Sequence, residues 1–271
     1  MDFLTIFGLI GGMGIVLGVM ASYHLISHLW NVEAFTLVIG GTIFCSMFSF
    51  PGHLIKRVLK SFGLVFKPQN FDASRTIDTL VDIAQKARRS GMIAIEKDMK
   101  ETKDPYLKLA LKMLIDNIDP HVIHETLEHE IQSMGQRHKA VVNVWITLAG
   151  YAPTFGLIGT VLGLIIVLSD LSDIGRLGES MASAIIATFY GLYFANFFFG
   201  PVGMKLNAQN EAEVLFKRAI TEGILSIQAG DVPYVTRTKL EAFLDNHMKS
   251  AKAKKSAADA GTVPGGATQA A

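Results

Sequence analysis

The chain has 271 residues, of which 50% are hydrophobic and only 18% are charged. This composition is too apolar for an ordinary soluble domain unless the apolar residues are concentrated in membrane spans. The net charge of +1, with both signs mixed along the chain, gives no basic footprint for nucleic acid, so no nucleic-acid partner is expected.

Four long segments contain no Asp, Glu, Lys or Arg, namely residues 3–32, 34–55, 140–169 and 180–204. Each is long enough to cross a hydrocarbon core, which takes about 20 apolar residues in a helix. We therefore predict an all-α polytopic membrane protein with four transmembrane helices, at residues 3–22, 34–51, 142–168 and 179–200. The first segment lacks a basic start and a small-residue cleavage motif, which favours a retained span over a secretory signal.

Lys and Arg are distributed unevenly between the connecting segments. Of the 25 such residues, only Arg176 falls in the two short loops that would join span one to span two and span three to span four. The positive-inside rule then places both termini and the middle segment in the cytoplasm. The predicted parts are 1–51 and 140–204 in the bilayer, 52–139 as a helical cytoplasmic insert, 205–249 as cytoplasmic C-terminal helices, and 250–271 as a disordered tail.

The cytoplasmic insert has the pattern of short amphipathic helices. Apolar residues from Ile77 to Ala84 follow helical spacing, and Gly91 is placed to end that helix. Asp-Pro pairs at 104–105 and 119–120 are typical helix starts, with an N-cap followed by Pro at the first helical position. The apolar face of the last helix allows it to continue unbroken into span three.

Motifs of soluble enzymes are absent, and no enzymatic activity is expected. The glycines between residues 8 and 18 lie inside an apolar run and no Gly-Lys-Ser or Gly-Lys-Thr follows them, which argues against a phosphate-binding loop. Pairs of glycines four residues apart, at 8 and 12, 14 and 18, and 159 and 163, favour close packing of membrane helices instead. The His and Glu residues between 121 and 129 are scattered around a helix, so a solvated face is favoured over a zinc site, and neither a metal nor a cofactor is predicted.

Spans three and four carry the polar features of the membrane region. Pro153 and Pro201 each remove a backbone donor and free the carbonyl one turn earlier, which then needs protein or water beside it. Thr160 lies two turns after Pro153 on the same face, and Thr188 lies in the middle of span four. Each Thr can also bond back to its own helix, but together with the prolines they indicate a hydroxyl-lined ion route.

No span contains a central carboxylate, Lys or Arg. An ion carrier normally needs an ionisable group inside the membrane, because the charge of that group couples to the gradient. If the protein conducts ions, a partner must supply the carboxylate.

At this point the chain resembles a known family, the MotA/PomA stator subunits. Residues 152–164 (APTFGLIGTVLGL) are similar to the third span of that family, and residues 181–206, which contain Ala-Thr-Phe-Tyr-Gly and Pro201, are similar to the fourth. Similarity extends to residues 1–12, to Gly-Gly-Thr-Ile-Phe at 40–44, and to Ala-Arg-Arg-Ser-Gly at 87–91 with Ile-Glu at 95–96. It covers about residues 1 to 248.

The resemblance implies an ion-channel subunit of the flagellar motor stator in the bacterial inner membrane. It implies a pentamer around two single-span B-subunits of the MotB/PomB type, which supply an Asp for the coupling ion and grip peptidoglycan. It also implies that Arg88, Arg89 and Glu96 contact the rotor protein FliG, that Pro153 and Pro201 serve the power stroke, and that Thr160 and Thr188 line the ion path. At position 97 this chain has Lys in place of an acid found in sodium-type members.

The coupling ion is Na⁺ or H⁺. The Thr160 and Thr188 hydroxyls favour sodium, which needs several oxygen ligands, whereas Ala187 stands where sodium-type members carry Thr and favours the proton; sodium is the preferred hypothesis. An energiser like TolQ or ExbB shares the pore helices but usually has three spans. A solute transporter working alone is disfavoured by the absence of an inverted repeat and of intramembrane charge.

Overall fold

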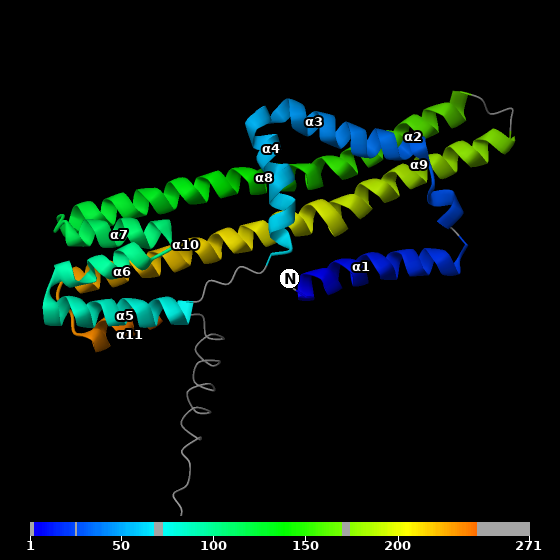
Figure 1. The fold of residues 1–271 in the computed structure, drawn as a ribbon. Coiled ribbons are helices and arrows are strands. Elements are labelled where there is room, and N and C mark those ends of the chain that lie inside the picture. The colour runs from blue at the N-terminus through cyan, green and yellow to red at the C-terminus, as the bar shows by residue number, and fades with distance from the viewer. Residues whose placement is uncertain (1–2, 25, 68–72, 170–173, 243–271) are drawn as a thin grey trace, which may run out of the picture. The chain divides into compact units, whose positions relative to one another are not determined.

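The computed structural model describes residues 3–24, 26–67, 73–169 and 174–242, and these are helical throughout apart from short turns (Figure 1). The chain divides into two compact units. The first, here called the apolar unit, comprises Met1–Gln69 and Gly135–Glu211, and the second, the polar unit, comprises Asn70–Met134 and Ala212–Ala271. The predicted tail 250–271 lies outside the described residues.

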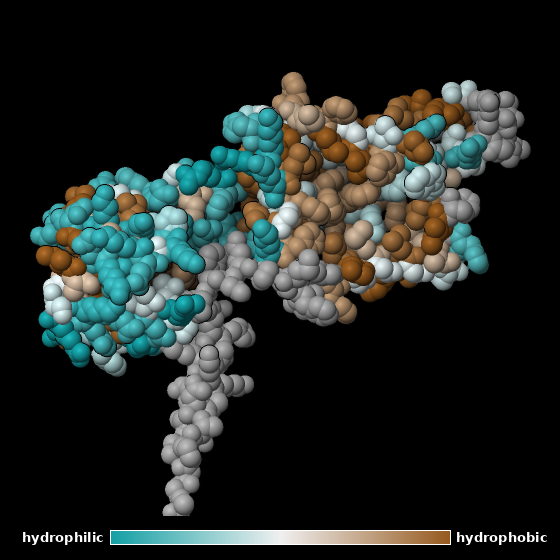
Figure 2. Space-filling view, viewed as in Figure 1, coloured by the Kyte–Doolittle hydropathy of each residue, from teal (hydrophilic) through white to brown (hydrophobic). Residues whose placement is uncertain are grey.

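Apolar side chains gather on the surface of the apolar unit, whereas polar side chains cover the polar unit (Figure 2). Within the described residues, three helical stretches are long and apolar enough to cross a membrane, namely Val32–Ser49, a part of Pro120–Ser169, and a part of Leu177–Gln228. A shorter apolar helix covers Phe7–Ser22. The all-α prediction is confirmed, and the several apolar helices are those of a membrane protein.

The first apolar helix, α1, covers Phe3–Ser22, and a 3₁₀ turn at Ile26–Leu29 leads to the second helical run. That run begins with α2 (Val32–Phe35), continues through a π-helical turn at Thr36–Gly40, and ends with α3 (Gly41–Ser49). It starts at Val32 because the side chain of Asn31 accepts the amide N–H of Ala34 at 2.8 Å, which satisfies one of the unpaired donors at a helix start.

Helix α4 (Gly52–Val65) follows directly and buries one face against α8. Its buried residues, Leu54, Val58, Ser61 and Val65, recur at helical spacing. The indole Nε1 of Trp145 donates to the hydroxyl of Ser61 at 3.0 Å, so the one polar group on this face is satisfied. Helix α4 is thereby fixed to the membrane helices.

The polar unit is built around α5 (Ala73–Ser90), a 3₁₀ turn at Met92–Ile95, α6 (Glu96–Glu101) and α7 (Pro105–Ile115). Its core is formed by apolar side chains of α5, α7, the start of α8, the end of α10, and α11. Gly91 ends α5 as predicted, with φ of +82°, a left-handed conformation that glycine adopts without strain. The predicted helix starts at Pro105 and Pro120 are confirmed, and the carboxylates of Asp104 and Asp119 accept N–H groups of the first turns.

Helix α8 runs without a break from Pro120 to Ser169, which confirms that the helix after Asp119 continues into the third apolar segment. Helix α9 covers Ile174–Phe194, a π-helical turn follows at Ala195–Phe199, and α10 covers Gly200–Gln228. The last described helix, α11, covers Pro233–Glu241. Helices α8 and α10 each contribute residues to both units.

Candidate functional site

Helices α8 and α9 pack closely against each other through small residues. A Cβ atom added to Gly159 would lie 2.5 Å from Cβ of Ala187, and one added to Gly163 would lie 2.5 Å from Cβ of Ala184. At Gly191 an added Cβ would meet the carbonyl oxygen of Ala152, also at 2.5 Å. The packing predicted for the glycine pair 159 and 163 is therefore found, and the backbones approach more closely than larger side chains would allow.

The hydroxyls of Thr160 and Thr188 meet in this interface and are hydrogen-bonded to each other. The Oγ1 atom of Thr160 also lies 3.2 Å from the carbonyl oxygens of Gly156 and Ala184, and Oγ1 of Thr188 lies 3.4 Å from that of Gly156. Both side chains are partly buried. The structure thus brings together the two Thr residues selected from the sequence, although 28 positions separate them.

The chemistry of this cluster follows from its count of donors and acceptors. Two hydroxyls carry two protons, and two carbonyl oxygens accept within reach. Although one hydroxyl donates to the other, each hydroxyl oxygen keeps at least one lone pair that accepts no hydrogen bond from the described residues. The cluster therefore presents oxygen ligands and no fixed charge. Oxygen atoms of this kind suit a hard cation or a chain of water molecules.

Pro153 and Pro201 lie at different kinds of position. Pro153 lies inside α8, and its Cα lies 3.1 Å from the point where a Cβ on Gly191 would stand, so it belongs to the same interface as the two Thr residues. Pro201 follows the π-helical turn, in which the N–H of Gly200 donates to the carbonyl of Ala195, five residues earlier. Proline has no N–H and would interrupt the regular series of helical hydrogen bonds. The wider turn shifts the pattern of backbone hydrogen bonds just before the proline.

Several polar residues near this interface were not selected from the sequence. A cavity of about 610 Å³ borders Gly159 and Ala187 and is also lined by Glu33 and Glu179. At its edge the amide of Asn31 donates to the hydroxyl of Ser183 at 2.9 Å. Glu33 and Glu179 lie just outside the charge-free segments, whereas Asn31 and Ser183 lie inside them. Composition alone gives no signal that these four residues come together.

Thr42 and Ser46 of α3 form a second unpredicted feature. They are 0% and 2% exposed, and their hydroxyl oxygens have no hydrogen-bond partner among the described residues. They lie one turn apart and continue a buried stripe that begins with Ala34 and Val38. Their spacing on one face could have been found from the sequence, but their burial could not.

The glycines of α1 behave differently from those of α8. A Cβ on Gly12 would lie 3.2 Å from the ring of Phe197, whereas Gly8, Gly14 and Gly18 face open space among the described residues. The close helix packing predicted for this stripe is therefore made within the chain at Gly12 alone.

The predicted rotor-facing residues lie at the turn between α5 and α6 in the polar unit. Arg88 and Arg89 are exposed in the last turn of α5, and neither has an ion-pair partner among the described residues. Glu96 lies across the Gly91 turn at the start of α6, but its carboxylate pairs with the ammonium group of Lys100 at 2.7 Å. This hydrogen bond lowers the pKa of Glu96, so it stays charged. Among the described residues, the turn therefore presents two cations without an ion-pair partner and a charged Glu96 whose partner is Lys100.

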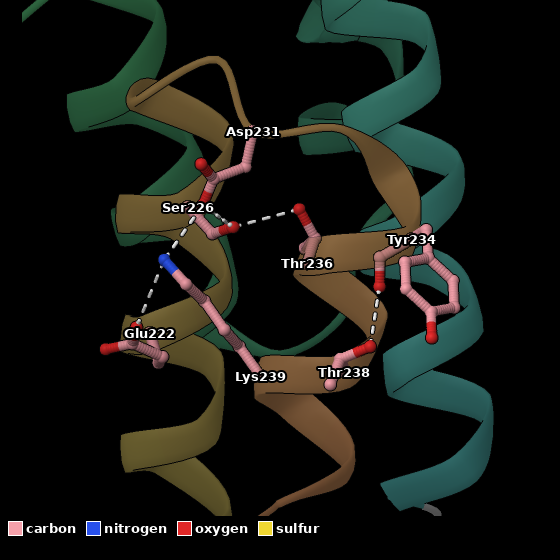
Figure 3. A network of polar contacts seen from close by, with 7 residues as sticks. All are labelled: Glu222, Ser226, Asp231, Tyr234, Thr236, Thr238 and Lys239. Atoms are coloured by element: carbon pink, nitrogen blue, oxygen red, sulfur yellow. Dashed lines mark hydrogen bonds and ion pairs between the residues drawn. The ribbon is translucent and has the colours of Figure 1, made fainter.

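Helix α11 contacts the N-terminal part of α5 through an ion pair. Arg237 of α11 pairs with Asp78 of α5 at 2.8 Å. Helix α11 is in turn bound to the end of α10 by the polar network in Figure 3. In this network Ser226 donates to the carboxylate of Asp231 at 2.7 Å, and Lys239 of α11 donates to it at 2.8 Å. These bonds lower the pKa of Asp231, since both stabilise its charged form.

No group of three or more His, Cys, Asp or Glu side chains is placed to hold a metal ion in the part of the chain that the structure describes. His121, His124, Glu125 and His129 are exposed. Glu128 pairs instead with Arg218 at 2.7 Å.

Comparisons with known proteins agree on one family. The family model described as the MotA/TolQ/ExbB proton channel family matches residues 98–219. Motility protein A of Treponema pallidum is 34% identical over 92% of this chain and 96% of its own length. The chemotaxis protein PomA of Vibrio alginolyticus is 30% identical over 93% of this chain and 97% of its own length.

Solved structures give the same result. The chain is similar to one in the structure of C. jejuni MotAB, with a TM-score of 0.84, 31% identity and coverage of 91% of this chain and 97% of the other. It is also similar to one in the flagellar MotAB stator complex from Bacillus subtilis, with a TM-score of 0.80, 30% identity and coverage of 89% and 98%.

Proposed function

Because this chain belongs to the MotA/PomA family of motility proteins, we propose that α8 and α9 conduct the coupling ion of a flagellar motor together with a carboxylate from a second protein. The chain is the ion-channel subunit of a flagellar motor stator, as its likeness to MotAB stator chains indicates. The observation that carries the proposal is the hydroxyl pair of Thr160 and Thr188 between two helices whose apolar segments contain no charged residue.

The partner is a single-span B-subunit of the MotB/PomB type, and its Asp carries the ion. Residues 140–169 and 180–204 contain no Asp or Glu, so this chain offers uncharged oxygen ligands and no group that can be neutralised by the ion. The cavity lined by Glu33 and Glu179 adds negative charge beside Gly159 and Ala187. Charge of that sign raises the local concentration of cations near the hydroxyl pair.

The arrangement in the cell follows from the loop charges. The protein has four spans, 3–22, 34–51, 142–168 and 179–200, in the bacterial inner membrane, with both termini and the insert 52–139 in the cytoplasm. Residues 205–249 form the cytoplasmic C-terminal helices. Five copies surround two B-subunits, so that the α8 and α9 surfaces of different copies face the partner's Asp in turn.

Torque passes to the rotor protein FliG through the turn between α5 and α6. Arg88 and Arg89 are exposed and unpaired in the described part of the chain, which makes them available to an acidic surface. Glu96 is bound by Lys100, and both side chains remain partly exposed, so Glu96 can exchange that partner for a cation of the rotor. Contacts of this kind determine orientation and the rate of encounter more than affinity.

Pro153 and Pro201 allow the helices to change their bend when the ion binds. A helix containing proline lacks one backbone hydrogen bond and bends more readily at that point. Pro153 lies in the α8–α9 interface, where a small shift at the hydroxyl pair reaches it directly. Pro201 follows the π-helical turn that continues α9, the helix of Thr188.

The test is ion flux in proteoliposomes with and without the B-subunit. We expect no flux from this chain alone, flux with the partner, and no flux when the partner's Asp is replaced by Asn. Gradient-driven flux from the isolated chain would contradict a borrowed carboxylate. A deletion strain that keeps its flagellar filaments but does not swim would separate this function from that of a TolQ-like or ExbB-like energiser.

A further inference from the structure

A cavity of about 500 Å³ opens on the apolar unit between three elements far apart in sequence. Its walls come from Gly8 of α1, from Phe62 and Phe66 at the end of α4, and from the segment around Pro201. A volume of this size accommodates a small organic molecule or a long hydrocarbon chain.

The cavity exists because α1 touches the rest of the unit at only a few points. A Cβ on Gly12 would contact Phe197, whereas one turn earlier a Cβ on Gly8 would find nothing within 4 Å. The outer side of α1 is also exposed, with Phe7 and Ile10 at 67% and 66%. Helix α1 therefore leaves a gap on the side where Gly8 lies, and the other walls of this gap come from α4 and α10.

The chemistry of the walls is that of an amphiphile site. Aromatic and aliphatic side chains make up most of the lining, while the polar lining residues, Asn196 and Lys205, come from the π-helical turn and α10. Lys67 is exposed and directly follows the lining residue Phe66 in sequence. Away from Asn196 and Lys205 the walls offer no side-chain partners to ordered water, which needs two or more of them.

We propose that this cavity binds one acyl chain of an anionic phospholipid from the cytoplasmic leaflet, with the phosphate at Lys205 and Lys67. In a bilayer the medium that fills an apolar gap open to the membrane is a hydrocarbon chain, because lipid tails are as apolar as the walls and pack against them. Basic side chains beside membrane helices on the cytoplasmic side select anionic headgroups. A second copy of the protein is the competing occupant, and the experiment distinguishes the two.

The bound chain would lie against Pro201 and fill the space beneath α1. It would therefore support the segment in which the π-helical turn meets α10. Lipid binding at this cavity requires only that the apolar unit lies in a bilayer. It does not depend on which residues conduct the ion.

Trp145 provides an internal probe for this site. Its ring centroid lies 6.1 Å from those of Phe62 and Phe198, both of which line the cavity, and Trp145 itself is 6% exposed. The other Trp, Trp30, is 87% exposed and does not line this cavity, so Trp30→Phe leaves a single reporter. Bromine atoms on a lipid chain quench tryptophan emission only at short range.

The experiment titrates brominated phosphatidylglycerol or brominated phosphatidylcholine into the purified Trp30→Phe protein in mixed micelles. We expect saturable quenching of Trp145 by the anionic lipid at a lower mole fraction than by the zwitterionic lipid. Lys205→Gln should raise the half-saturating mole fraction of the anionic lipid about fivefold, equivalent to roughly 1 kcal/mol for one basic side chain, without affecting the other lipid.

Gly8→Phe and Gly11→Phe form a matched pair of variants. Added side chains at both positions point into open space, but only Gly8 lines the cavity. We expect Gly8→Phe to abolish the saturable quenching and Gly11→Phe to retain it. Equal quenching by both lipids in all variants would mean bulk lipid contact alone, and absence of quenching would mean that a second copy or the protein itself closes the site; either result overturns the proposal.

Discussion

The hydroxyl oxygens of Thr160 and Thr188 are hydrogen-bonded to each other across the interface between α8 and α9. Each is also within hydrogen-bond distance of the carbonyl oxygen of Gly156. Neither hydroxyl is therefore limited to bonding back to its own helix. A change at one Thr must alter the partners of the other, so the two form one functional unit.

Removing one of these hydroxyls should impair ion flux without impairing assembly. Thr188→Val keeps the shape of the side chain but removes an oxygen ligand, so we expect flux in proteoliposomes containing the B-subunit to fall several-fold, with a larger loss at low sodium. Thr154→Val is the matched control, because the Thr154 hydroxyl is exposed and bonds to the carbonyl of Tyr151 in the same helix. Flux that depends on the proton gradient and is indifferent to sodium would identify the proton as the coupling ion.

Enlarging Gly163 should separate the two helices. The added Cβ of Gly163→Ala would meet Cβ of Ala184 at 2.5 Å, and overpacking of this kind costs about 1–3 kcal/mol. The measurement is thermal unfolding of the purified protein, and we expect a lower midpoint. Gly150→Ala, which meets nothing within 4 Å, should leave the midpoint unchanged or raise it.

The same interface permits a rescue experiment. Ala184→Gly removes the methyl group that a Cβ at position 163 would meet, so the double variant with Gly163→Ala should recover much of the lost stability. If the two substitutions are simply additive, the helices do not pack at these two residues.

The π-helical turn before Pro201 should be sensitive to substitution. A Cβ on Gly200 would lie 2.9 Å from the carbonyl oxygen of Ala195, so Gly200→Ala strains the turn. Pro201→Ala restores a backbone N–H and allows an ordinary α-helix. We expect both variants to swim poorly at normal protein levels, as measured in soft agar with immunoblotting. Normal swimming by Pro201→Ala would remove Pro201 from the power stroke.

Charge reversal at the turn between α5 and α6 should affect the rotor contact alone. Exposed charges contribute only about 0–1 kcal/mol to stability, so Arg88→Glu should leave folding and ion flux unchanged while reducing swimming. Glu96→Lys should do the same, and a compensating charge reversal on FliG should partly restore swimming.

Lys100 supplies the control for this pair, because it binds Glu96 at 2.7 Å. Lys100→Ala frees the Glu96 carboxylate and should leave swimming near the parent level. If Arg88→Glu and Glu96→Lys both swim like the parent, separately and combined, the rotor contact lies elsewhere.

Tyr106 should make the polar unit unstable in alkali. Burial raises its pKa to about 12 even though its hydroxyl is hydrogen-bonded to that of Thr221 at 2.6 Å. The folded state thus favours the neutral phenol. This stabilisation is complete below the unfolded pKa of about 10, and up to about 3 kcal/mol of it is lost as the pH rises towards 12.

Thermal unfolding of the parent and of Tyr106→Phe between pH 8 and pH 11.5 tests this expectation. The variant loses the hydroxyl bond at neutral pH, which costs about 0.5–1.5 kcal/mol, but its stability should fall less steeply in alkali. Parallel pH profiles for the two proteins would show that Tyr106 ionises as it does in the unfolded chain.

Local features of the sequence determined the helices and many of their ends. Apolar runs longer than about 20 residues predicted the membrane helices, because backbone groups in a hydrocarbon core must bond within the segment. Asp-Pro pairs predicted the starts of α7 and α8, and Gly91 predicted the end of α5, because caps and a left-handed residue act within one turn. The resemblance to the family was likewise found from short motifs in the apolar segments and in the cytoplasmic insert.

Only the tertiary structure decided which of these residues act together. Thr160 can bond to its own helix or to α9, and the choice depends on how closely Gly159 and Gly163 let Ala187 and Ala184 approach. The π-helical turns have no local signal of their own. Propensity and caps extend over one or two turns of helix, whereas these outcomes depend on contacts between residues brought close only when the helices pack.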